Sequence, residues 1–289
     1  MSSKYRTLPQ VKFKEFRDLE RRRVETSDMV WAVLVGSKLA VKTLDEAPNR
    51  LILLADEYPE LPHVQRMNQR LDRAGQLLSD AENQICAMAF SLAFGLHEDF
   101  ARSCLKILFD HGSATREDTN AKSYRIHETL ADRTSHTIDA DALALFHLTR
   151  KIRNAHLHAA GLVSSGLVSQ YDSLTDSQRA LWAELTGNVF QIPSIAEPAT
   201  IGVPELIGAL AVQKRLAYDI NLCLQAVISR EYWADMAVAE YLAVSSKRPK
   251  DPSFVRSVMG YLRGGFTALK LTEEEVSDAV GRVKKSEVL

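Results

Sequence analysis

The chain has 289 residues, 46% hydrophobic and 25% charged, a balance that is typical of a globular protein and excludes a disordered one. Its 36 Lys and Arg residues are offset by 37 Asp and Glu residues, so any attraction for nucleic acid has to come from a local patch. The longest apolar runs, MVWAVLVG (29–36) and ICAMAFSLAFGL (85–96), are shorter than the roughly 20 residues that cross a bilayer. Because the N-terminus also lacks the apolar segment of a secretory signal, we expect a cytoplasmic protein with no membrane partner.

The first third of the chain predicts two long helices. One follows Pro9 and runs toward Asp45, with a charged, solvated early part (KFKEFRDLERRR) and a buried later part (MVWAVLVGSKLAV). After a short segment containing Pro59 and Pro62, a second helical pattern extends from about residue 63 to residue 109. Its stretch ICAMAFSLAFGL is apolar on every side, which predicts a helix that other helices surround.

The remaining helices follow from apolar periodicity and from helix caps. The pattern predicts helices over 116–133, 139–160 and 205–244, and a C-terminal helical pair over 253–269 and 272–285. Thr175 with Gln178, and Thr272 with Glu275, have the spacing of capping boxes. Pro193, Pro198 and Pro204 predict an extended connection, and SSKRPKDP (245–252) predicts a linker.

These elements together predict an all-α fold, a helical bundle with extra N- and C-terminal helices. We expect three consecutive regions: an N-terminal helical extension (1–60), a central bundle (61–244) and the C-terminal helical pair (245–289). Cys86, Cys104 and Cys223 form no CxxC motif, which favours free thiols in a reducing compartment, with a structural disulfide as the alternative. The absence of phosphate-binding loops and of a GxSxG motif argues against the common nucleotide-triphosphate enzymes and hydrolases.

The stretch KIRNAHLHAAG (151–161) carries most of the candidate chemistry. On a helical wheel, one side of the helix over 139–160 gathers a core stripe, made of Leu145, Leu148, Ile152, Ala155 and Ala159. The opposite side gathers His147, Arg150, Asn154 and His158, at spacings where side chains are neighbours. A face with two histidines, an arginine and an asparagine but no carboxylate is suited to an anion.

The segment RNAHLH, from Arg153 to His158, resembles the R-x4–6-H motif of HEPN-domain proteins, and Asn154 stands where that family often has a polar residue. The resemblance implies a HEPN-like helical core and a metal-independent endoribonuclease without cofactors, of the kind found among toxins and antiviral defence proteins. It also implies a homodimer in which two motifs form one composite site. The products would then be 2′,3′-cyclic phosphate and 5′-hydroxyl ends, and an antitoxin or regulatory partner could control the activity.

The residue types suit this chemistry. Histidine can give and take a proton at neutral pH, which assigns the proton transfers to His158. Arginine stays charged and offers a planar fork to phosphate, which assigns Arg153 to the scissile phosphate. On an ideal helix, however, the two side chains point about 140° apart, so a distorted helix end or a partner helix is needed to bring them together.

Alternatives remain open at this point. Arg150 and His156 form a second pairing within the motif's spacing, although His156 also faces the core stripe and has a packing role as its alternative. Asn154, Arg150, His147 and His156 are therefore supporting or RNA-binding candidates. His156 and His158 point apart on a helix, so we expect no metal site there. A non-catalytic helical protein that binds a protein or nucleic-acid partner is the competing function.

Overall fold

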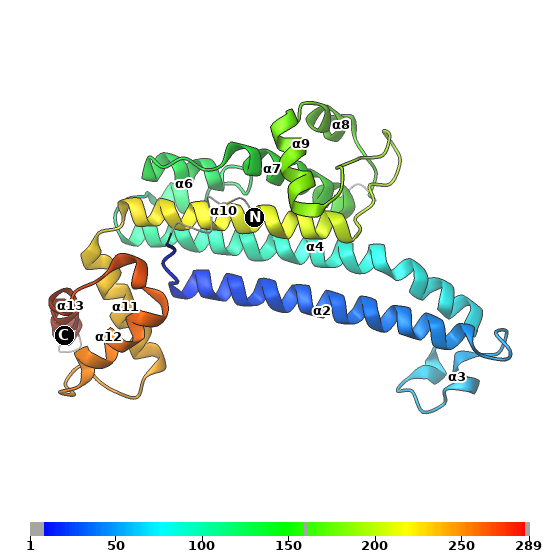
Figure 1. Cartoon of the computed structure of the whole chain (residues 1–289), viewed down its shortest axis with the longest axis horizontal. Helices are drawn as coiled ribbons and strands as arrows, with labels where there is room; N and C mark the ends of the chain where they lie inside the picture. The colour runs from blue at the N-terminus through cyan, green and yellow to red at the C-terminus, as the bar shows by residue number, and fades with distance from the viewer. Residues whose placement is uncertain (1–8, 159–160, 287–289) are drawn as a thin grey trace. The chain divides into compact units, whose positions relative to one another are not determined.

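The computed structural model describes residues 9–158 and 161–286, and in this part of the chain it is all-α, as predicted (Figure 1). The described residues contain twelve α-helices and two short 3-10 helices, together with isolated β-bridges but no strand. None of the described helices is both long and apolar enough to cross a membrane. The α-helices are α2 (Lys14–Asp45), α3 (Leu54–Glu57), α4 (Leu71–Asp110), α5 (Arg116–Thr119), α6 (Ile126–Thr134), α7 (Ala140–His158), α8 (Ser165–Asp172), α9 (Asp176–Thr186), α10 (Val203–Val227), α11 (Arg230–Val244), α12 (Phe254–Gly265) and α13 (Glu273–Ser286).

The chain divides into two compact units that are interleaved along the sequence. Unit 1 comprises Met1–Arg21, Gly95–His147 and Val212–Leu289, and unit 2 comprises Arg22–Phe94 and Leu148–Ala211. Helices α2, α4, α7 and α10 therefore each contribute one end to either unit. This division differs in kind from the three consecutive regions expected from the sequence, and the boundaries of those regions stay a prediction.

Unit 1 is built around a cluster of aromatic rings. Phe13 lies 5.8 Å from Trp233 and 6.3 Å from Phe100, measured between ring centroids. The segment before α2 is fixed to this core by Asn221, which is fully buried, accepts a hydrogen bond from the Val11 amide (3.2 Å) and donates one to the Val11 carbonyl (2.7 Å). A buried amide with both of its functions paired stabilises the position of this segment.

Unit 2 has Trp182 of α9 in its core. The Trp182 ring packs against Phe190 in a tilted arrangement, at 4.2 Å between centroids, and lies directly against the backbone of α10 at Gly208. A Cβ added at Gly208 would stand 2.3 Å from the indole ring. Only glycine leaves room for this contact, and it is how α9 packs against the first part of α10.

Several helix boundaries match the sequence prediction because local side chains set them. The first helix ends at Asp45, the residue expected from the sequence. Thr175 and Gln178 form a capping box at the start of α9. At the start of α13, the Thr272 amide donates to Glu275 Oε2 (2.7 Å), and Thr272 Oγ1 accepts from the Glu275 amide (3.2 Å).

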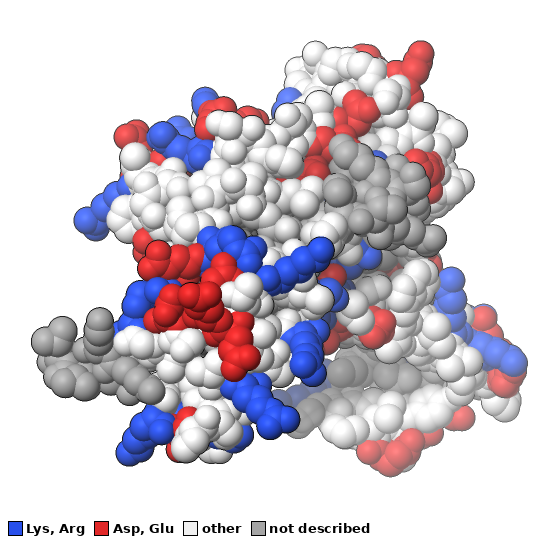
Figure 2. All heavy atoms as spheres, turned by 60° about the vertical axis from the view of Figure 1, so that its left-hand side comes forward, with Lys and Arg blue, Asp and Glu red and all other residues white. Residues whose placement is uncertain are grey.

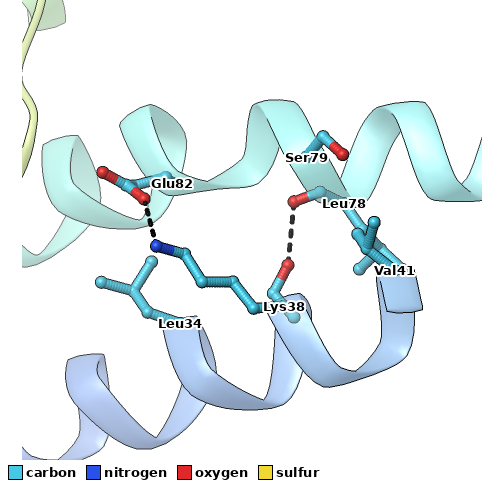
Figure 3. A pocket seen from close by; sticks show the side chains of 7 residues that line it. Leu34, Lys38, Val41, Leu78, Ser79 and Glu82 are labelled. Atoms are coloured by element: carbon cyan, nitrogen blue, oxygen red, sulfur yellow. Dashed lines mark hydrogen bonds and ion pairs between the residues drawn. The ribbon is translucent and has the colours of Figure 1, made fainter. Parts of the chain in front are cut away.

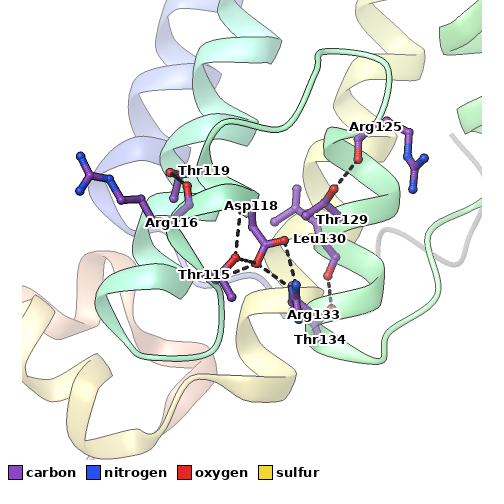
Figure 4. Close-up of polar contacts among 9 residues, drawn as sticks. All are labelled: Thr115, Arg116, Asp118, Thr119, Arg125, Thr129, Leu130, Arg133 and Thr134. Atoms are coloured by element: carbon purple, nitrogen blue, oxygen red, sulfur yellow. Dashed lines mark hydrogen bonds and ion pairs between the residues drawn. The ribbon is translucent and has the colours of Figure 1, made fainter.

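Two expected helices are each divided. The pattern over 116–133 forms α5 and α6, because Thr115 and Asp118 make a capping box that supports a separate four-residue helix. Arg133 of α6 forms an ion pair with Asp118 (2.8 Å), which holds the two short helices together (Figure 4). The pattern over 205–244 is interrupted after α10, where Ser229 Oγ accepts a hydrogen bond from the Tyr232 amide (3.2 Å) and so caps α11.

The two apolar stretches are less buried than expected. In MVWAVLVGSKLAV only Val30 and Leu34 are buried, and most of the other large apolar side chains are exposed. In ICAMAFSLAFGL, Met88 is 74% exposed and Leu92 is 45% exposed. Both predictions were wrong for the same reason: periodicity counts apolar positions but does not show how many neighbours a helix has.

The long helix α4 also begins at Leu71, eight residues later than the pattern suggested.

Candidate functional site

Helix α7, which carries the candidate motif, is fixed at its N-terminus by Asp139. The Asp139 carboxylate accepts hydrogen bonds from the amides of Asp141 (3.0 Å) and Ala142 (3.1 Å), and the Asp139 amide donates to Asp219 of α10 (2.9 Å). A carboxylate at this end also interacts favourably with the helix dipole. The buried members of the predicted core stripe are Leu145, Leu148 and Ile152, whereas Ala155 is half-buried and Ala159 lies outside the described residues.

The predicted polar side of α7 becomes more exposed toward its C-terminus. His147, Arg150 and Asn154 are half-buried, and His158, the last residue of the helix, is exposed. His147 lies in unit 1, where its Nε2 is 3.3 Å from Glu128 Oε1 of α6. A carboxylate from another helix therefore faces this histidine, which a wheel of α7 alone could not show.

A side-chain hydrogen bond links Arg153 to Asn154. Arg153 Nη1 donates a hydrogen bond to Asn154 Oδ1 (3.2 Å), while Arg153 Nε is buried without a partner among the described residues. Asn154 thus orients a guanidinium that retains unused donors. His158 is not joined to either residue: α7 stays helical to its end, so Arg153 and His158 point about 140° apart within one chain.

His156 has a structural partner. Its Nε2 lies 2.7 Å from the carbonyl oxygen of Ala199, and an imidazole facing a carbonyl must donate its N–H. The Ala199 amide in turn donates to the Gly161 carbonyl (2.7 Å), and Gly161 has a φ of +79°, a conformation that favours glycine. His156 therefore fastens the chain that follows α7 to the segment before α10, which supports the packing role over the pairing with Arg150.

Unit 1 contains a buried histidine pair that was not predicted from the sequence. His97 of α4 and His127 of α6 are each 1% exposed, and their Nε2 atoms are 2.9 Å apart. Phe146 of α7 packs on both rings, at 5.2 and 4.7 Å between centroids. The two Nδ1 atoms are buried without a partner among the described residues.

The environment of this pair keeps both rings neutral. Burial lowers the pKa of His97 to about 3, although nearby Glu98 opposes the shift. Burial also lowers the pKa of His127 well below its usual value, with further lowering by His97 and His147. Since one Nε2 must donate and the other accept, the rings adopt opposite tautomers. The only hint in the sequence is a histidine directly after the apolar run that ends at Leu96.

The arrangement of charged and metal-ligating side chains gives little further information about the candidate site. In the described part of the chain, no group of three His, Cys, Asp or Glu residues is placed to hold a metal ion. The three cysteines are free and buried. Basic and acidic side chains intermingle over the face seen in Figure 2, and among the residues coloured there no extended positive area stands out.

Comparison of the chain with protein-family models, curated proteins and solved structures finds no significant match.

Proposed function

We propose that the chain is a HEPN-like, metal-independent endoribonuclease that acts as a cytoplasmic homodimer, with Arg153 and His158 as its catalytic residues. The observation that carries the proposal is the end of α7, where Asn154 orients the Arg153 guanidinium and His158 is exposed. Free, buried cysteines agree with a cytoplasmic setting. A role in toxin or antiviral defence, under the control of a partner protein, belongs to the same proposal.

The proposed reaction needs no metal. A base removes the proton of the RNA 2′-hydroxyl, the 2′-oxygen forms a bond to phosphorus, and the bond from phosphorus to the 5′-oxygen breaks as that oxygen takes a proton from an acid. Histidine suits both proton transfers. Arg153 would stabilise the negative charge on the phosphate oxygens. Because the two side chains diverge within one helix, the site would combine Arg153 of one copy with His158 of another.

The test maps the ends of RNA fragments after incubation with the purified protein in EDTA. Cuts that leave 2′,3′-cyclic phosphates are expected from the parent and not from Arg153→Ala or His158→Ala. His136→Ala, which changes a histidine outside the motif, serves as the control and should cut normally. If either motif variant folds and cuts as well as the parent, the proposal fails.

Mixing the two inactive variants tests the composite site. A mixed dimer contains one copy with His158 and one with Arg153, so part of the activity should return. Activity that stays absent in a mixture shown to exchange subunits would rule out a site shared in this way.

The second candidate is a non-catalytic protein that binds a protein or nucleic-acid partner through its helices. The apolar side chains exposed on α2 favour it, because contiguous apolar surface is typical of a binding site. In that case no RNA would be cut, including total cellular RNA with its tRNA, and partner binding would survive the loss of His158.

A further inference from the structure

The middle of α2 exposes an ordered row of side chains in unit 2. Val24, Trp31 and Val35 are 52%, 46% and 54% exposed, and Asp28 is also exposed. Together with two lysines they follow alternating steps of four and three residues, the spacing of a coiled-coil seam. We call this row the α2 seam; its members are Val24, Asp28, Trp31, Val35, Lys38 and Lys42.

Within unit 2, α4 covers a different side of α2. Ser37 Oγ donates to the Leu78 carbonyl (2.8 Å), and Leu34 and Val41 line the groove between the two helices (Figure 3). Lys38 reaches Glu82 (3.4 Å) from the edge of this contact, and its side chain remains 76% exposed. The contact with α4 thus buries a narrow stripe and leaves the seam open.

The side of α2 that α4 does not contact is strongly apolar. No charged residue occurs from Met29 to Ser37, so α2 is apolar all round over this stretch, which is typical of an enclosed helix. Val33 and Leu39, on either side of the seam, are also about half exposed. Removing such area from water is favourable for association.

The order of residues along the seam fits a second copy of the same helix in the opposite direction. Asp28 lies five residues before Val33, and Lys38 lies five residues after it. Two antiparallel helices related by a twofold axis at Val33 would therefore place each Asp28 opposite a Lys38. The same axis places Trp31 opposite Val35, since they lie two residues before and after Val33.

Other arrangements lack this complementarity. Parallel helices in register would place Asp28 against Asp28 and Lys38 against Lys38, and like charges in contact disfavour that dimer. Anionic lipid is disfavoured because residues 20–46 contain five basic and five acidic residues, whereas helices that lie on membranes are rich in Lys and Arg.

We propose that the α2 seam forms a homodimer interface in which two α2 helices pack antiparallel about Val33. Apolar contacts of Trp31 and Val35 drive the association, and the Asp28–Lys38 pairs set its direction and register. The interface does not depend on the ribonuclease proposal, because none of the motif residues of α7 lies on the seam.

The test measures the mass of the full-length protein by sedimentation equilibrium over a range of concentrations. The parent should be a dimer. Asp28→Lys and Lys38→Asp should each weaken it by roughly tenfold or more, because each change replaces two attractive pairs with repulsive ones. The double variant Asp28→Lys/Lys38→Asp restores both pairs and should dimerise like the parent.

Mixing the two single charge variants tests the pairing of Asp28 with Lys38 most directly. An Asp28→Lys chain and a Lys38→Asp chain carry complementary seams, so the mixture should form heterodimers with the parent's affinity, although each variant alone associates through the seam roughly tenfold or more weakly. Thr43→Lys adds a positive charge at an exposed position off the seam and should leave the dimer intact. Circular dichroism checks that all variants stay folded.

A monomeric parent would overturn the proposal. A parent dimer that survives Val35→Lys would also overturn it, since the interface would then lie elsewhere. Equal weakening in the single and the double charge variants would exclude the antiparallel register. Co-sedimentation of the parent with vesicles of anionic phospholipid, lost in Val35→Lys, would assign the seam to a membrane instead.

Discussion

The buried pair of His97 and His127 should make unit 1 sensitive to mild acid. Burial lowers the pKa of both rings, so the folded protein keeps them neutral, whereas the unfolded chain binds protons at the ordinary pKa near 6.5. A group whose pKa is lowered by folding contributes stability above its unfolded pKa. That contribution is lost as the pH falls below about 6.5 and continues to fall toward the folded pKa, about 3 for His97.

The size of the effect follows from linkage. One proton taken up on unfolding costs about 1.4 kcal/mol of unfolding free energy for each pH unit below the unfolded pKa. Lowering the pH from about 7.5 to about 5.5 therefore removes about 1.4 kcal/mol for each histidine, or somewhat under about 3 kcal/mol for the pair. This is a large share of the roughly 5–15 kcal/mol that stabilises a typical domain. Both rings are 1% exposed, so solvent screening reduces the loss little.

Urea unfolding at a series of pH values, followed by tryptophan fluorescence, measures this slope. The variant His97→Phe/His127→Phe keeps two rings in place and should lose most of the acid sensitivity between about pH 6.5 and 5.5. His158→Gln, which removes an exposed histidine, should keep the acid sensitivity of the parent. The most strongly shifted carboxyl group, Glu275, has its pKa lowered to about 2 by Arg230 and does not titrate in this window. Equal slopes for the parent and the double Phe variant would refute the reasoning.

Three further changes test the packing and the caps, each by urea unfolding beside the parent. Gly208→Ala should destabilise unit 2 by about 1–3 kcal/mol, because the clash with Trp182 outweighs the gain of about 1 kcal/mol in helix propensity; unchanged stability would mean that the indole ring moves aside. Asn221→Ala should cost about 2–3 kcal/mol and speed proteolysis near Val11, whose amide and carbonyl lose their buried partner; no change in cleavage there would contradict this. Thr175→Ala removes the cap of α9 and should cost about 1 kcal/mol, whereas a neutral result would show that the cap is dispensable.

Helix boundaries were predictable where a side chain bonds its own backbone. The starts of α9 and α13 could be predicted at Thr175 and Thr272 because the cap and its partner lie three residues apart in sequence. The breaks near Asn120 and Ser229 were missed because apolar periodicity continues across them. What divides those helices is local bonding at Thr115 and Ser229, in residues that also occur inside continuous helices.

Burial was harder to predict than helicity. The seam residues Trp31 and Val35 have the composition of a core, yet whether an apolar side chain is covered depends on how many helices pack around it. The pair of His97 and His127 shows the same limit for the polar residues. Thirty residues separate them, and only the packing of α4 against α6 places their Nε2 atoms at hydrogen-bonding distance.

The motif at the end of α7 has some features that were predictable from the sequence and others that were not. The wheel placed His156 near the core stripe, which agrees with its contact with the Ala199 carbonyl, whereas the hydrogen bond between Arg153 and Asn154 was not predicted. The convergence of Arg153 with a histidine could not be read, because one regular helix separates five-residue neighbours by about 140°. A single copy of α7 therefore places Arg153 or His158 at any one point in space, but not both. The proposed ribonuclease site would need a second copy, and under that proposal a chain held strictly monomeric should lose cleavage even with Arg153 and His158 unchanged.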